Sequence, residues 1–238
     1  MIALISSLPF EQNIIRSTIS EPEQLNLGTK KAIKGTCNGL PVILFSPGIG
    51  KVNAAHGATL LCEHFPIQLL ISHGVGGAYP NSGLEVGQIA VATSEIYGDE
   101  GVVEPDGWHA MEHIGVPVVE RQGKIYFNNF FVMPYLVQKI QTAIELMNIK
   151  SAIGPFITLS TSSGTTERAL ELENRFGGIC ENMEGAAVAH ICTIYNVPFA
   201  EIRGISNITE DRNKKKWNIE LASSNCQKTL LNVITKLA

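Results

Sequence analysis

Short apolar runs recur along the chain, and each ends at or beside a glycine, serine or proline. They are rich in Ile, Val and Leu and have the length of strands. Continuous apolar runs of this kind indicate strands that are covered on both faces, as in a largely parallel sheet. The expected strands are Ile2–Ser6, Val42–Phe45, Leu69–Ser72, Ile89–Ala92, Ile153–Leu159 and Phe199–Ile205.

Amphipathic segments between these runs predict helices. In one of them, apolar residues recur at spacings of three and four from Val188 to Tyr195. Thr165 or Thr166 can cap another. Alternating strands and helices indicate an α/β layered fold, and 238 residues fit a single domain, 1–238. The expected helices are Val52–Phe65, Tyr135–Met147, Thr165–Phe176, Glu184–Tyr195 and Asn218–Leu237.

The composition argues against a nucleic-acid-binding, membrane-spanning or secreted protein. A net charge of -4 provides no basic field for nucleic acid, and Lys214–Lys216 is expected to be a solvated loop. No run reaches the roughly 18 apolar residues of a membrane helix, and the N-terminus lacks the positive region of a signal peptide. The 5 scattered cysteines indicate reduced thiols and a cytoplasmic protein.

Two glycine-rich segments follow expected strands. Ser-Pro-Gly-Ile-Gly-Lys at 46–51 lets the backbone approach an anion at a helix start, although a tight turn is the simpler interpretation. Gly-Val-Gly-Gly at 74–77 does not complete a dinucleotide fingerprint. Two such turns suggest one ligand crevice at the strand ends, beside Val75 and Gly76.

His109-Ala-Met-Glu-His113 has the spacing of an inverted zincin motif. That chemistry needs both histidines on one helix, with the glutamate as base. Proline and glycine on either side of the segment disfavour a two-turn helix. We therefore expect a surface loop and no metal site.

Four polar residues lie where a ligand could reach them. Glu184 opens a helix and could accept hydrogen bonds from the vicinal hydroxyls of a ribose, although the helix dipole alone favours an acid there. Arg203 and Asn207 follow a strand, at the end that commonly lines sites in α/β sheets. Asn207 could equally turn the chain, and Glu11 could be an ordinary surface acid.

These segments together resemble the nucleoside phosphorylase/nucleosidase superfamily over most of the chain. The resemblance rests on the first strand with Glu11 and on the segments at 46–55, 74–77, 181–190 and 197–207. Within the superfamily the chain is similar to the methylthioadenosine/S-adenosylhomocysteine nucleosidases. It is more similar still to the futalosine hydrolases, through the segments at 97–102, 203–207, 211–212 and 217–222.

The resemblance implies one α/β domain with a mixed, twisted sheet flanked by helices. It implies a homodimer or higher homo-oligomer and cleavage of an N-ribosidic bond without a cofactor. Glu11 matches the residue that activates water, while Met183 and Glu184 match the pair that binds the ribose. Asn207 matches the residue that faces N7 of the purine.

Asn207 stands where the adenosine-type enzymes carry Asp. Its amide offers two N–H donors, which suit the N7 and O6 acceptors of a 6-oxopurine. Adenine would oppose its amino group to the amide, and a buried mispaired polar group costs roughly 1–3 kcal/mol. Asn207 therefore favours hypoxanthine or guanine over adenine. The resemblance implies futalosine, a nucleoside of menaquinone biosynthesis that carries hypoxanthine, as the substrate.

Water is the expected nucleophile. Phosphorylase relatives hold phosphate with arginines, and this chain has none between Arg16 and Arg121, a stretch that includes both glycine segments. Val75 stands where a hydroxyl would serve phosphate, and Lys51 is the only nearby cation. An adenine-releasing nucleosidase, a purine nucleoside phosphorylase, a zinc peptidase and a binding module are the alternatives.

The remaining expected contacts surround the base and the 5′ substituent. Ser206 and Arg203 support the strand end that carries Asn207, and Gly164 and Thr165 border the base. Trp217 is expected to stack on an aromatic 5′ substituent, although a tryptophan of the core or of a dimer interface would look the same.

Overall fold

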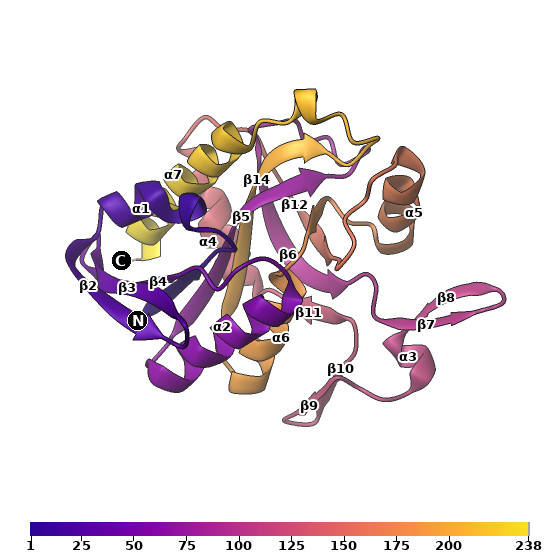
Figure 1. Cartoon of the computed structure of the whole chain (residues 1–238), viewed down its shortest axis with the longest axis horizontal. Helices are drawn as coiled ribbons and strands as arrows, with labels where there is room; N and C mark the ends of the chain where they lie inside the picture. The colour runs from indigo at the N-terminus through magenta and orange to yellow at the C-terminus, as the bar shows by residue number, and fades with distance from the viewer. Residues whose placement is uncertain (238) are drawn as a thin grey trace.

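The computed structural model describes residues 1–237. One mixed ten-stranded sheet forms its centre, in the order β11-β6-β12-β13-β5-β1-β4-β3-β2, with β14 paired to β5 and β6 (Figure 1). The strands of this sheet are β1 (Ile2–Ile5), β2 (Ser20–Leu27), β3 (Lys30–Cys37), β4 (Leu40–Phe45), β5 (Leu69–Ala78), β6 (Ile89–Tyr97), β11 (Asn129–Phe131), β12 (Ser151–Thr158), β13 (Cys180–Asn182) and β14 (Phe199–Ile208).

Helices cover both faces of the sheet. On one face α2 and α6 pack against each other, and on the other face α7 lies along β14 and β5 and contacts α1 and α4 (Figure 1). This arrangement is the expected layered α/β fold. The helices are α1 (Asn13–Ser17), α2 (Lys51–His64), α4 (Pro134–Glu145), α5 (Thr166–Phe176), α6 (Gly185–Tyr195) and α7 (Ile219–Leu237), with short 3-10 helices at Pro9–Gln12 and Lys214–Lys216.

All six expected strands and all five expected helices are present, but the sheet is not largely parallel. β14 runs parallel to β5 and antiparallel to β6, and β13 is antiparallel to β5. Helices on both faces bury either kind of strand equally, so continuous apolar runs do not distinguish the two pairings. The mixed sheet that the family resemblance implied is confirmed.

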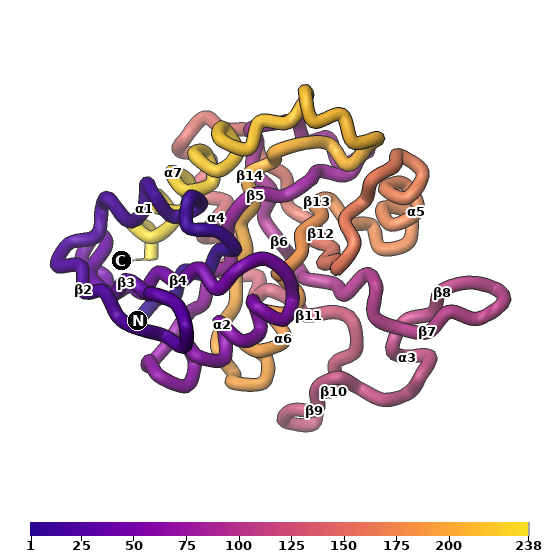
Figure 2. The backbone as a smooth tube through the Cα atoms, viewed as in Figure 1, coloured from indigo at the N-terminus to yellow at the C-terminus, as the bar shows by residue number. Residues whose placement is uncertain are grey.

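The stretch between Tyr97 and Asn129 forms a lobe that projects from the body of the molecule (Figure 2). We define the lobe as residues 98–127. It contains two hairpins and one turn of helix: β7 (Gly101–Glu104), β8 (Gly107–Ala110), α3 (Met111–Ile114), β9 (Val119–Arg121) and β10 (Lys124–Tyr126).

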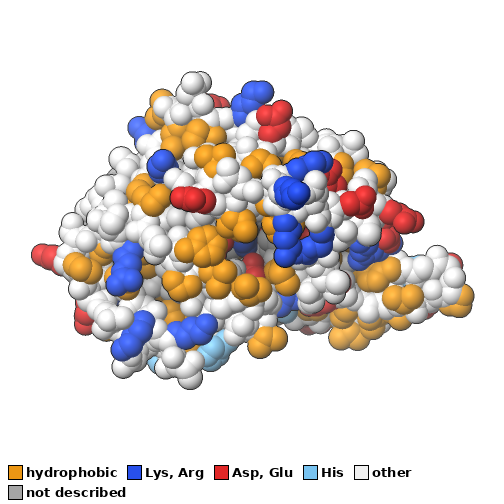
Figure 3. Space-filling model, turned by 45° about the horizontal axis from the view of Figure 1, so that its top comes forward, with side chains coloured by type: hydrophobic (Ala, Val, Ile, Leu, Met, Phe, Trp, Pro, Cys, Tyr) orange, Lys and Arg blue, Asp and Glu red, His pale blue; other side chains and the backbone are white. Residues whose placement is uncertain are grey.

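The surface of the body mixes residue types. On the face drawn in Figure 3, hydrophobic side chains gather near the middle and Lys and Arg side chains lie to their right. In residues 1–237, none of the helices combines the length and the apolar character that crossing a bilayer requires.

Candidate active site

The segment Gly74–Gly77 lies inside β5 and not in a turn after it, because β14 and β13 continue to pair with it as far as Ala78. A Cβ atom on Gly74 would lie 2.4 Å from Oε1 of Glu11 and 3.3 Å from Nη1 of Arg203. The φ angle of Gly74 is 149°, in the region that favours glycine. Glycine here lets two charged side chains reach the main chain of the strand.

Glu11 is held against β5 by main-chain donors. It lies in the 3-10 helix Pro9–Gln12, and its carboxylate accepts from the N–H of Leu8 at 2.8 Å and from the N–H of Val75 at 2.9 Å. Glu11 is only 2% exposed. Burial raises the pKa of Glu11 above its ordinary value, against the opposing charge of Arg203. A raised pKa makes this carboxylate a stronger base than an exposed glutamate.

The loop at 46–50 does bind an anion, and the anion is the side chain of Glu184. The N–H of Gly50, just before α2, donates to Oε1 of Glu184 at 2.9 Å. Glu184 precedes α6, where Oδ1 of Asn182 accepts from the N–H groups of Glu184 and Gly185 at 2.9 and 2.7 Å. Because Asn182 caps the helix, the Glu184 carboxylate is not needed as its cap.

Arg203 pairs with Glu184 and lies near Glu11. Its Nη1 donates to the carbonyl oxygen of Val75 at 3.1 Å, and its Nη2 lies 3.5 Å from Oε2 of Glu184. Its Nε donates to Glu201 at 2.7 Å. A cavity of about 10 Å³, room for a single water molecule, is lined in part by Glu184 and Arg203. Four expected site residues, Glu11, Val75, Glu184 and Arg203, therefore form one cluster.

Ser206 and Asn207 lie beside the glycines of β5. The Ser206 hydroxyl is 2.8 Å from Oδ1 of Asn207 and 3.1 Å from the carbonyl oxygen of Gly76. One N–H of the Asn207 amide donates to the carbonyl oxygen of Ile208 at 3.1 Å. The hydroxyl fixes the amide so that its NH₂ group faces away from Ser206, and one N–H remains for a ligand.

The other expected contacts are less enclosed. Met183 is half-buried directly before Glu184, and Gly164 is exposed. The hydroxyl of Thr165 accepts from the N–H of Arg168 at 3.2 Å, so this side chain caps the N-terminus of α5. Of the two threonines expected as the cap, Thr165 and Thr166, it is Thr165. Trp217 is half-buried, and the guanidinium of Arg212 lies over its ring at 5.1 Å. One face of the indole is therefore already covered.

Lys51 is not a free cation. Its ammonium group pairs with Asp99 and with Glu100, the latter at 3.2 Å, and lies 4.8 Å from the centre of the Tyr97 ring. Both acids belong to the segment 97–102 that follows β6. The two carboxylates neutralise the only lysine of the first glycine segment.

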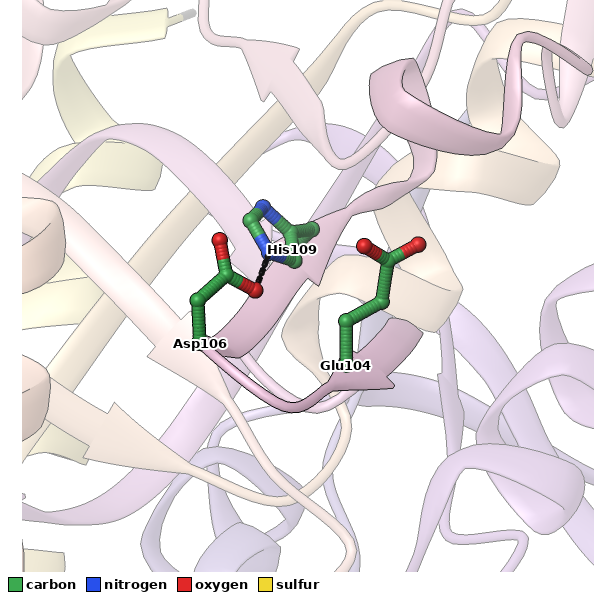
Figure 4. A group of neighbouring side chains, drawn as sticks. All are labelled: Glu104, Asp106 and His109. Atoms are coloured by element: carbon green, nitrogen blue, oxygen red, sulfur yellow. Dashed lines mark hydrogen bonds and ion pairs between the residues drawn. The ribbon is translucent and has the colours of Figure 1, made fainter.

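The H-x-x-E-H segment does not form a helix that carries both histidines. His109 lies on β8 and His113 in the single turn α3, and their rings stack with centroids 4.4 Å apart. Asp106 pairs with His109 at 2.8 Å and Glu104 with His113 at 3.0 Å. Glu104 and Asp106 are exposed and His109 is half-buried, and the side chains of Asp106 and His109 point toward one another (Figure 4). The segment is a surface segment as expected, but it forms part of a hairpin and one helical turn and not a loop.

Buried acids behind the site escaped the sequence analysis. Glu95 and Glu201 are fully buried, and Glu181 is nearly so, accepting from the N–H of Ser163 at 2.8 Å and from the Tyr79 hydroxyl at 3.2 Å. A signal for Glu201 exists in the sequence. Its spacing of two from Arg203 in an otherwise apolar strand places an acid and a base on one face.

Comparison with known proteins identifies the family. The model of the "Phosphorylase superfamily" matches residues 1–235. A futalosine hydrolase of Thermus thermophilus is 33% identical over 194 residues, which is 82% of this chain and 80% of that protein. A 5′-methylthioadenosine/S-adenosylhomocysteine nucleosidase of Maridesulfovibrio salexigens is 30% identical over 241 residues and 99% of each chain.

Solved structures show the same fold. The corresponding nucleosidase of Neisseria meningitidis, in complex with methylthio-immucillin-A, superposes with a TM-score of 0.86 at 21% identity over 98% of each chain. The Borrelia burgdorferi protein described as a putative nucleosidase bound to adenine gives 0.83 at 26% identity, over 98% of this chain and 99% of that one. With its family match and these relatives, the chain belongs to the phosphorylase superfamily, among its nucleosidase-type hydrolases.

Proposed function

We propose that this enzyme hydrolyses the N-glycosidic bond of futalosine and releases hypoxanthine. The observation that carries the proposal is the amide of Asn207, which Ser206 orients at 2.8 Å so that its NH₂ group can face a base. One N–H of this amide donates to Ile208, and the N–H that remains suits O6 of a 6-oxopurine but not the amino group that adenine carries at the same position. The similarity to a futalosine hydrolase supports the same substrate.

The carboxylates supply the rest of the reaction. Glu11 orients a water molecule and takes its proton as the glycosidic bond lengthens toward an oxocarbenium-like transition state. Glu184 holds the ribose hydroxyls, with Met183 packed under the sugar. Asn207 cannot act as a full acid, so the base leaves as an anion that the amide dipole stabilises.

The balance of charge favours water over phosphate as the nucleophile. Arg203 does reach the glycine-rich strand, although the chain has no arginine between Arg16 and Arg121. Its guanidinium faces Glu201 at 2.7 Å and Glu184 at 3.5 Å, and Glu11 lies nearby. Lys51 is paired with two acids. A phosphate dianion would therefore meet cations whose charge is already balanced.

Release of adenine from methylthioadenosine or S-adenosylhomocysteine is the second candidate activity. The relative named for that activity aligns with 99% of this chain, against 82% for the futalosine hydrolase. Asn207 opposes it, because an amide N–H would face the amino group of adenine.

We also propose that Trp217, with Arg212 over one of its faces, stacks its other face on the 5′ substituent. Gly164 and Thr165 lie at the same rim, since a Cβ on Gly164 would be 3.7 Å from Cδ of Arg212. Through that contact the loop before α5 and the loop after β14 meet. Both loops would then border the base and the 5′ group.

A substrate panel tests the proposal. The purified enzyme is incubated with futalosine, inosine, methylthioadenosine and S-adenosylhomocysteine, each with and without phosphate, and the released base is identified by chromatography. We expect hypoxanthine from futalosine without phosphate, and no turnover in a Glu184→Ala variant that remains folded. Adenine from methylthioadenosine as the main product would contradict the assignment to futalosine, and a strict need for phosphate would contradict hydrolysis.

A further inference from the structure

Two glutamates meet in the dry interior directly behind the site. Glu95 comes from β6 and Glu201 from β14, adjacent strands, and both are 0% exposed. A Cβ atom on Gly185 would lie 2.1 Å from Oε1 of Glu95 and 2.3 Å from Oε2 of Glu201. Because both oxygens lie beside the same point, Oε1 of Glu95 and Oε2 of Glu201 are neighbours. Glycine at the start of α6 leaves room for both.

Three of the four carboxylate oxygens have hydrogen-bond donors. Oε2 of Glu95 lies 2.6 Å from the Thr158 hydroxyl, and Oε1 accepts from Nδ2 of Asn182 at 2.7 Å. Oε1 of Glu201 accepts from Nε of Arg203 at 2.7 Å. Among the described residues Oε2 of Glu201 has no hydrogen-bond partner, and it is the oxygen beside Glu95. A buried, unpartnered oxygen next to a second carboxyl group is satisfied when that group carries a proton.

The surrounding charges agree with one retained proton. Burial, and next the negative charge of Glu201, raise the pKa of Glu95 well above its ordinary range. Arg203 is the permanent cation of the cluster, and it donates to Glu201 and not to Glu95. The ionisable groups of other elements that face this cluster are Glu11 beside β5, His73 of β5, Cys180 of β13, Glu184 before α6 and Cys226 of α7.

Each member of the pair is linked through one intermediate residue to Glu184, the carboxylate proposed to bind ribose. Glu201 holds the guanidinium of Arg203, whose Nη2 lies 3.5 Å from Glu184. Glu95 accepts from Asn182, whose Oδ1 caps the helix at the N–H groups of Glu184 and Gly185. Displacing either glutamate would therefore shift Glu184 through its charge partner or through its main chain.

We propose that Glu95 carries a proton that it donates to Glu201, and that this carboxyl–carboxylate pair is a positioning device for Arg203 and Glu184. Neither glutamate touches the substrate. The effect on turnover rests on the proposed function, whereas the shared proton does not depend on it.

Infrared spectroscopy tests the proton directly. Wild-type enzyme at neutral pH should show the C=O stretching band of a buried protonated carboxylic acid, and one component of that band should be missing in Glu95→Gln. The matched control is Glu220→Gln, which changes an exposed glutamate of α7 and should leave the band intact. An identical band in wild type and in Glu95→Gln would overturn the proposal whether or not any nucleoside is cleaved.

Turnover tests the positioning role. In Glu95→Gln an amide N–H takes the place of the carboxyl proton and donates to Glu201. The NH₂ group cannot accept the hydrogen bond from Asn182, so that one bond is lost. We therefore expect kcat to fall by no more than about fivefold. Glu201→Gln removes the anion that holds Arg203 and should lower kcat by about 10- to 100-fold. Equal losses in the two variants, with both folded by circular dichroism, would show that Glu95 acts as an anion and would contradict the shared proton. If Glu201→Gln does not fold, Glu95→Ala takes its place and should lose more activity than Glu95→Gln.

Discussion

Glu11 accepts its two hydrogen bonds from main-chain N–H groups, so the backbone at residues 8 and 75 sets its position. Its burial has a cost in stability. A carboxyl group whose pKa is higher in the folded than in the unfolded state penalises folding once the pH exceeds the unfolded value, ordinarily 4.5 for glutamate. The residue that we propose to activate water is thus also a source of instability at neutral pH.

The Glu11→Gln variant separates the two effects. We expect kcat to fall by about 10²- to 10⁴-fold, because the general base is lost. The melting temperature should rise at neutral pH and match wild type at strongly acidic pH, where Glu11 is protonated in both states. Turnover assays and thermal unfolding across pH measure both. A variant that keeps its activity would remove Glu11 from the mechanism.

The pH profile of the wild-type enzyme carries a related prediction. Glu11 must be ionised to accept the proton of water, and burial raises its pKa above the ordinary 4.5. The rate constant kcat/KM should therefore fall with decreasing pH at a midpoint above that of an exposed glutamate. Initial rates over a pH series, with folding checked at each pH, measure the midpoint. A midpoint at or below the ordinary value would mean that Glu11 is not the titrating base.

Asn207→Asp tests how the base is selected. An aspartic acid can donate to N7 while its other oxygen accepts from a 6-amino group, so the preference should move from futalosine toward methylthioadenosine. Correcting one mispaired polar contact changes the ratio of the two kcat/KM values by about 5- to 150-fold, equivalent to roughly 1–3 kcal/mol. An unchanged ratio would show that Asn207 does not read the base.

At the scale of elements, β5 matters because its glycines let side chains from other elements approach the strand. Gly74→Ala would place a Cβ atom 2.4 Å from Oε1 of Glu11. Displacing that oxygen by about 1 Å should lower kcat by about 10²-fold. Gly83→Ala is the matched control, since Gly83 also has a positive φ angle, 73°, but no atom within 4 Å of its Cβ position. Similar activity in the two variants would contradict the close approach of Glu11.

The elements also show what sequence can predict. The apolar runs locate β1, β4 and the start of β5, because buried strands and their hydrophobic pattern coincide. They miss the hairpin of β2 and β3, whose residues are largely polar and exposed. They end β5 too early, since Gly-Val-Gly-Gly looks like a turn until its pairing with β14 is known.

Within the site, Glu11, Glu184 and Arg203 could be chosen from their places on predicted elements and from the family resemblance. Their mutual contacts could not, because those contacts depend on the order of strands in the sheet. The meeting of Glu95 with Glu201 is of the same kind. It requires β14 to lie next to β6, a pairing between segments about a hundred residues apart that no local pattern reveals.

At the scale of the whole molecule, the lobe projects from the body and is accessible to other molecules (Figure 2). It presents the apolar side chains of Val103, Val116 and Ile125, which are 77%, 61% and 61% exposed. Exposed apolar residues on a projecting lobe favour an interface between proteins. They support the proposal of a homodimer, which follows from the family resemblance.

Light scattering coupled to size-exclusion chromatography tests that proposal. Wild type should elute as a dimer, and the double variant Val103→Glu/Ile125→Glu should shift toward monomer. Leu146→Glu introduces the same change at an exposed residue beyond the lobe, after α4, and should remain dimeric. A monomeric wild type, or a double variant that stays dimeric, would remove the lobe from the interface.

The register shift between Ile205 and Asn207 has an evolutionary consequence. Arg203 pairs with Gly74 and Asn207 with Gly77, so four steps along β14 correspond to only three along β5. Arg203, which lies beside Glu184, and Asn207, which is proposed to face the base, therefore do not follow the simple alternation of one regular strand. Under the proposed function, a lineage could replace the residue at 207, and with it the preferred nucleobase, while keeping the proposed ribose contacts unchanged.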